Sequence, residues 1–237
     1  MTRSLQRTDE LGRAFAGSQL QIQIYVARRQ SQLTAAVAAA MERPDLAGQL
    51  QWTAPLEDHR FAEPYDRAFL DALALEGHQE ELRAFWPSGG PHWDALAVVG
   101  THGRPALIVL AEGKSYPGEV YGPGCLAEDA ESLRLIDSAL ASTRAWLNVA
   151  ETASWRGRLY QYANRLAHLY FLNKILGVPA WLVNLCFVGD GTTTPTTESE
   201  WRAALPAIKE ELGFPPGRIP RVSDVLLPAR ERTELIG

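Results

Sequence analysis

Two short apolar runs in the middle of the chain restrict its fold more than any other feature. Trp93 to Val99 (WDALAVV) and Ala106 to Glu112 (ALIVLAE) are separated by GTHGRP, a turn-rich link of the length found in hairpins. They predict two adjacent antiparallel strands. Because both faces of both runs are apolar, the sheet should be covered by helices on its two sides, as in α/β architectures.

The remaining patterns predict one domain over 1–237, because 237 residues with 46% hydrophobic side chains can bury a core. Its parts are an N-terminal helical extension at 1–50, a core at 60–190 and a C-terminal helix-strand extension at 196–237. The first part contains a helix from Gly17 to Met41, although LQIQIYV also allows a strand at its start. Further helices are predicted at Pro64–Leu75, Leu126–Trp146, Trp155–Leu176 and Glu198–Leu212, and further strands at Ala180–Val188 and Ile219–Leu227.

Composition limits location and partners. No apolar run approaches the roughly 18 residues that span a bilayer, and the start, MTRSLQRTDELGR, lacks the apolar core of a signal peptide. We therefore expect a cytoplasmic protein with no membrane partner. The 2 cysteines have no CxxC spacing, so neither a zinc site nor a disulfide framework is indicated. A net charge of -5 disfavours non-specific binding to nucleic acid, so any such function must depend on a local site.

The register of the hairpin brings two acids together. If the turn is symmetric about Gly103, Leu96 faces Leu110 and Asp94 faces Glu112, because both pairs of numbers have the same sum. Directly opposed side chains have Cβ atoms about 4.5–5.5 Å apart. This spacing suits joint ligation of Mg²⁺ by the two carboxylates.

Lys114 lies two residues beyond Glu112, so the period of a strand places both side chains on the same face. Opposed carboxylates on a buried sheet repel one another, and a divalent cation would remove that conflict. The structural alternative is that the acids reach solvent at the strand ends, or that Lys114 neutralises them in a salt bridge.

The sequence Asp94, followed on the next strand by Glu112-Gly113-Lys114, resembles the signature of the PD-(D/E)xK nucleases. The resemblance spans roughly 64–188. It implies a restriction-endonuclease-like mixed sheet flanked by helices. It also implies that Asp94, Glu112 and the carbonyl of Gly113 hold Mg²⁺ or Mn²⁺, while Lys114 orients or deprotonates the attacking water.

One position departs from the pattern, and one ligand remains to be assigned. The residue before the aspartate is Trp93, and the nearest proline is Pro91, which weakens the recognition more than the mechanism. The family can use a further acid from the preceding helix. Glu63 is the first choice for this metal ligand, and Glu76 is the second.

The predicted helix from Trp155 carries a polar stripe. Gln161, Asn164, Arg165 and His168 recur at helical spacing among Leu, Tyr and Phe residues. Gln161 and Arg165 resemble a glutamine-containing motif of nucleases related to the RecB nuclease domain, with arginine in place of the usual later tyrosine. As catalytic residues they could stabilise negative charge on a phosphate. The alternative is an ordinary solvated helix face.

Two loop motifs have weaker interpretations. Glu119 in SYPGEVYGPG could help to bind a second cation, although turn formation is the simpler role. Gly189-Asp190-Gly191 lacks the lysine of a phosphate-binding loop, so a surface turn is expected.

The sequence thus predicts a Mg²⁺-dependent nuclease that hydrolyses phosphodiester bonds, with DNA as the expected substrate. Two alternatives remain open: a non-catalytic nuclease-like module for binding or assembly, and a hydrolase of a small phosphorylated substrate. The oligomeric state, including a homodimer, is also open.

Overall fold

The computed structural model describes residues 7–100, 105–150 and 154–237, which form a mixed sheet between two layers of helices. The sheet has 5 strands in the order β1-β2-β3-β4-β5. The first three strands pair antiparallel, whereas β3–β4 and β4–β5 pair parallel. The strands are β1 (Gln51–Ala54), β2 (Ala95–Val99), β3 (Leu107–Lys114), β4 (Ala180–Val188) and β5 (Val222–Pro228).

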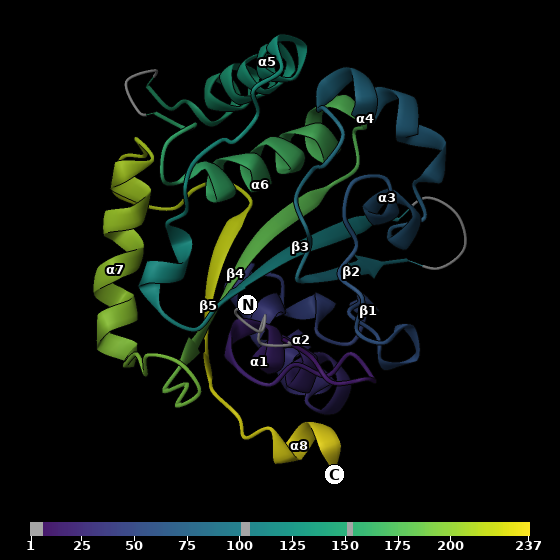
Figure 1. Ribbon diagram of the computed structural model, residues 1–237, viewed down its shortest axis with the longest axis vertical. Coiled ribbons are helices and arrows are strands. Elements are labelled where there is room, and N and C mark those ends of the chain that lie inside the picture. The colour runs from purple at the N-terminus through teal and green to yellow at the C-terminus, as the bar shows by residue number, and fades with distance from the viewer. Residues whose placement is uncertain (1–6, 101–104, 151–153) are drawn as a thin grey trace, which may run out of the picture.

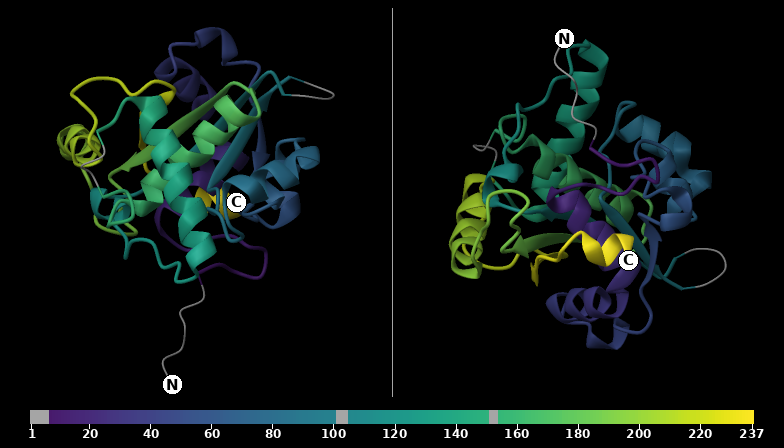
Figure 2. Two further views of the ribbon diagram at one scale, coloured as in Figure 1. Left: turned by 90° about the horizontal axis from the view of Figure 1, so that it is seen from above. Right: turned by 60° about the horizontal axis from the view of Figure 1, so that its bottom comes forward.

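Helices cover both faces of this sheet (Figure 1). α4, α5 and α6 lie on one side and α1 and α2 on the other, while α7 stands beside the β4–β5 edge. Figure 2 shows from above that α5 and α6 lie against one another over the sheet. The helices are α1 (Gly17–Arg28), α2 (Gln30–Ala40), α3 (Ala68–Ala72), α4 (Gln79–Phe85), α5 (Ala130–Leu147), α6 (Tyr160–Tyr170), α7 (Glu198–Glu211) and α8 (Thr233–Ile236). None of the helices within the described ranges is long and apolar enough to cross a lipid bilayer.

The two faces of the sheet bury separate clusters, as the doubly apolar strands predict. Leu96 and Leu110 belong to the cluster under α5 and α6, and Ala97 and Val109 belong to the cluster under α1 and α2. Side chains alternate between faces along each strand, so even-numbered residues of β2 and β3 point toward α6. The expected α/β architecture with a mixed, helix-flanked sheet is therefore confirmed.

The predicted hairpin register is confirmed where it is described. Leu96 pairs with Leu110, and the paired run ends at Ala95 and Ala111. Asp94 comes directly before β2 and is not itself part of the paired strand. The turn at Gly103 lies outside the described residues.

Several predicted helices have different boundaries. The expected Gly17–Met41 helix is two helices that meet at Arg29, where φ is -127°, because α1 packs on β3 and α2 packs on β5. The strand allowed at its start is absent from these described residues. The helix expected from Leu126 begins after Asp129, whose carboxylate caps the amide of Ser132.

Three other differences concern the lengths and number of elements. The helix expected at 64–75 is confined to α3, and the one expected from Trp155 begins at Tyr160 and ends in a π-helical turn at Phe171–Ile175. The sequence interpretation missed β1, α4 and α8. β5 pairs with β4, so the C-terminal helix-strand segment contributes to the same sheet.

Candidate active site

The acids and the lysine of the predicted signature meet at one end of the hairpin. Glu112 and Lys114 lie near the end of β3, on the face turned toward α6. Asp94 reaches this point from the start of β2, because its Oδ2 accepts the backbone N–H of Gly113 at 2.8 Å. In an extended strand the N–H and C=O of one residue point to the same side, so the Gly113 carbonyl also faces Asp94.

Glu112 is held by two cations. Its Oε1 accepts a hydrogen bond from Lys114 Nζ at 2.7 Å, and its Oε2 accepts one from Arg165 Nε at 2.9 Å. The Glu112 and Arg165 side chains are each 9% exposed, and that of Lys114 is 15% exposed. The alternative in which Lys114 neutralises the acids requires this salt bridge. The Lys114 ammonium also interacts electrostatically with Asp94.

All three guanidinium nitrogens of Arg165 donate hydrogen bonds to neighbouring groups. Besides Glu112, it donates from Nη1 to Asn164 Oδ1 and from Nη2 to the His92 carbonyl, both at 2.9 Å. Its guanidinium lies 5.7 Å from the centre of the Trp93 ring. α6 therefore fixes the position of Glu112 from above the sheet.

The polar stripe on α6 is not a solvated helix face, so that interpretation is wrong for three of its four members. Asn164, Arg165 and His168 are buried, and His168 lies among the rings of Trp86 and Trp93. Gln161 is exposed. The helix turns this stripe inward because the Arg165 side chain finds a buried carboxylate partner there, without which its burial would be costly.

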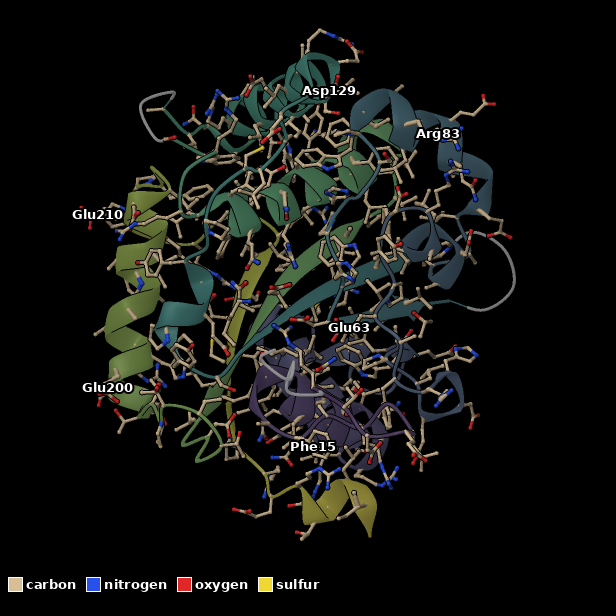
Figure 3. All side chains as sticks on the ribbon, viewed as in Figure 1. Phe15, Glu63, Arg83, Asp129, Glu200 and Glu210 are labelled. Atoms are coloured by element: carbon tan, nitrogen blue, oxygen red, sulfur yellow. The ribbon has the colours of Figure 1, made fainter. Side chains whose placement is uncertain are left out.

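Glu63 lies nearby, in the segment before α3. Its Oε1 accepts a hydrogen bond from Gln19 Nε2 of α1 at 2.9 Å, and its charge acts on both Asp94 and Glu112. In Figure 3 it lies near the middle of the view, whereas Arg83, Asp129, Glu200 and Glu210 lie toward the periphery. Glu76 is exposed on a 3₁₀ turn between α3 and α4.

Burial and neighbouring charges shift the pKa values of Asp94, Glu112 and Lys114. Burial, and then the charge of Glu112, raise the pKa of Asp94 to about 8. Burial alone would also raise the pKa of Glu112, but Arg165 and Lys114 outweigh it and hold that pKa below its usual range. Burial opposes the charge of Lys114, yet Glu112 and Asp94 raise its pKa above the ordinary value. Lys114 is therefore an ammonium ion at neutral pH.

The donors gathered here suit a hard divalent cation. Asp94, Glu112 and the Gly113 carbonyl offer only oxygen, and within the described part of the chain Oδ1 of Asp94 accepts no hydrogen bond. Among the described residues, no group of three His, Cys, Asp or Glu side chains is placed to hold a metal ion. Mg²⁺ commonly uses one or two carboxylates and keeps several waters, so two carboxylates and one carbonyl are ligands of the kind that a Mg²⁺ site uses.

Two hollows adjoin the charged cluster. A cavity of about 20 Å³, room for about one water, lies beside Glu112 and Lys114 under mostly apolar walls. An open groove of about 750 Å³ reaches Gln161 and Arg165 between the segments 86–92 and 122–132. Its rim includes the carboxylates of Glu128 and Asp129, so it is not a basic groove.

A second polar group next to Glu112 was not predicted. Asn184 of β4 stands beside Glu112 in the sheet register, and Asp224 of β5 stands beside Asn184. The Asn184 amide donates to Tyr162 Oη and to Asp224 Oδ1, both at 2.8 Å, and Lys209 donates to the other Asp224 oxygen. Asn184 is the one polar residue in AWLVNLCFV, which was a usable signal.

The surface turn expected at Gly189-Asp190-Gly191 is wrong for Asp190, whose side chain is buried. It accepts a hydrogen bond from the Ser115 hydroxyl at 2.5 Å and from the Thr192 hydroxyl at 2.6 Å. Glu119, considered for a second cation, instead accepts the Ser115 N–H at 2.6 Å. These contacts fix the chain directly after Lys114.

Comparisons with protein-family models, curated proteins and solved structures give no match for this chain.

Proposed function

We propose that this protein is a metal-dependent nuclease of the PD-(D/E)xK class, with a restriction-endonuclease-like fold, that hydrolyses phosphodiester bonds, with DNA as the expected substrate. The observation that carries the proposal is the meeting of Asp94, Glu112 and Lys114 at one end of the β2–β3 hairpin. Asp94 and Glu112 would hold Mg²⁺ or Mn²⁺ with the Gly113 carbonyl, and Glu63 is close enough to act on them electrostatically. The bound ion would polarise the phosphoryl group and lower the pKa of a water.

The residues of the chain have distinct tasks in this proposal. Lys114 is charged, so it orients the attacking water and a phosphate oxygen as a hydrogen-bond donor and does not serve as the base. Arg165 positions Glu112, because all its nitrogens are already engaged in the interior. Gln161 is exposed on α6 and lines the groove, so it can contact substrate directly.

One observation favours the non-catalytic alternative. Both oxygens of Glu112 already have cationic partners, so the network is electrostatically satisfied without a metal. In that case the cluster would be a buried salt-bridge network of a binding or assembly module. Lys114 is partly exposed, and Oδ1 of Asp94 accepts no hydrogen bond from the residues that the structure describes; both observations argue instead for exchange of one partner.

The test is cleavage of plasmid, single-stranded DNA, RNA and mononucleotides in Mg²⁺, Mn²⁺ or EDTA. We expect metal-dependent cleavage of a polynucleotide, reduced at least about 100-fold by Lys114→Met. Lys174→Met, at an exposed lysine on the π-helical turn, is the matched control and should retain full activity. Activity unchanged in Lys114→Met would refute the proposal. Hydrolysis of mononucleotides alone would favour the small-substrate hydrolase.

A further inference from the structure

Two exposed aromatic rings stack on one another beside the charged cluster. The Tyr65 and His92 rings are 4.5 Å apart between centroids, with an angle of 16° between their planes. Tyr65 is 49% exposed, and His92 is exposed as well. Each ring covers one face of the other, so the accessible surface belongs to the outer faces and edges of the pair. The stacked pair therefore leaves part of its surface accessible to solvent.

The backbone fixes this pair firmly. Tyr65 and His92 form an isolated antiparallel bridge, and Trp93 N donates to the Pro64 carbonyl at 2.9 Å. The His92 carbonyl in turn accepts a hydrogen bond from Arg165 at 2.9 Å. The backbone of His92 is therefore anchored by the same arginine that holds Glu112.

Both residues of the pair are close in sequence to acids of the charged cluster. Tyr65 is two residues after Glu63, and His92 is two residues before Asp94. His92 also lines the open groove that reaches Gln161 and Arg165. A ligand that contacts this pair would therefore lie next to the groove and beside the segments that carry Glu63 and Asp94.

Charge makes such a contact useful to a nuclease. The chain has a net charge of -5, and the groove rim carries Glu128 and Asp129, so few phosphates can be neutralised by the protein. Stacking of a base on an aromatic ring contributes affinity that does not depend on protein charge.

We propose that the Tyr65–His92 pair is a stacking platform for a nucleobase of the substrate. Because a base inside a duplex already stacks on both of its neighbours, the platform requires an unpaired base. The substrate class is therefore single-stranded nucleic acid or a frayed duplex end, not an internal duplex site. This inference rests on the proposed nuclease function.

The test compares oligonucleotides that differ at one base. Tyr65→Leu should lower kcat/KM on a single strand by roughly 5- to 150-fold, the range expected for loss of one stacked base, while Tyr65→Phe should stay within about twofold of the wild type. An abasic nucleotide scanned along the substrate should produce the same loss in the wild type at one position. At that position Tyr65→Leu should add little further loss, because the contact has already been removed.

Phe15→Leu is the matched control, since Phe15 is a similarly exposed ring (45%) that contacts Arg232 instead of the cluster. It should leave kcat/KM unchanged. If the wild type cleaves, but no abasic position matters and internal duplex is cut as fast as a single strand, the platform is refuted and the nuclease proposal survives. If the wild type cleaves no polynucleotide, both proposals fall. The abasic scan uses wild-type protein, so the answer does not depend on how the variants fold.

Discussion

Replacing Asp94 with asparagine should stabilise the metal-free protein at pH 8. The pKa of Asp94 is raised from 3.8 in the unfolded chain to about 8 in the fold, first by burial and then by Glu112. The folded state therefore binds more protons than the unfolded state between these two values, and its stability falls as the pH rises through this window. Asparagine has no proton to lose, and its carbonyl can still accept the Gly113 N–H.

The magnitude follows from the same values. About 1.4 kcal/mol for each pH unit above 3.8 gives an upper bound of about 4 kcal/mol at pH 7. Solvent screens part of this, because Asp94 keeps some exposure, and the new amide loses some hydration. We expect a net stabilisation of about 2 kcal/mol at pH 8 and almost none at pH 4.

Urea unfolding of both proteins in EDTA at pH 4, 6 and 8 measures this difference. Added Mg²⁺ should then stabilise the wild type and leave Asp94→Asn unchanged, because the variant lacks a ligand. A variant that is less stable than the wild type at pH 8, or a difference that does not change with pH, would refute the electrostatic reasoning.

Two further predictions concern the interior side of the cluster. Arg165→Met should lower the free energy of unfolding by about 3–5 kcal/mol, because it leaves Glu112 with a single cation; a loss below about 1 kcal/mol in urea unfolding would contradict this. Burial lowers the pKa of His168 to about 4, so the wild type should lose up to about 3 kcal/mol as the pH falls from 6.5 to 4. His168→Phe should lose that part of the pH dependence, and an equal pH slope in both proteins would count against it.

The hairpin could be predicted from sequence because a period of two leaves few choices of register. Leu96 opposite Leu110 follows from the two apolar runs alone, and the meeting of Asp94 with the Glu112–Lys114 segment follows from it. β1 could not be predicted, because QWTA is too short to show the alternating pattern of a strand. The break between α1 and α2 depends on where each half packs, which the local sequence does not record.

Side-chain contacts between residues far apart in the sequence could not be predicted. Helical spacing identifies the stripe that contains Arg165, but only the fold shows that Glu112 lies across from it. Likewise, Gly189-Asp190-Gly191 predicts a turn, but these residues alone do not predict the hydrogen bond from Ser115 to Asp190. Asn184 was visible as a polar residue in an apolar strand, yet its partner on β5 was not.

The most direct test of the account is an anomalous difference map from crystals of the protein soaked in Mn²⁺. We predict one strong peak about 2.0–2.3 Å from oxygens of Asp94 and Glu112, beside the Gly113 carbonyl. Such a peak requires Glu112 to release at least one of its present partners. A map with no peak there, and with Glu112 still bound by both Lys114 and Arg165, would contradict the proposed metal-dependent chemistry.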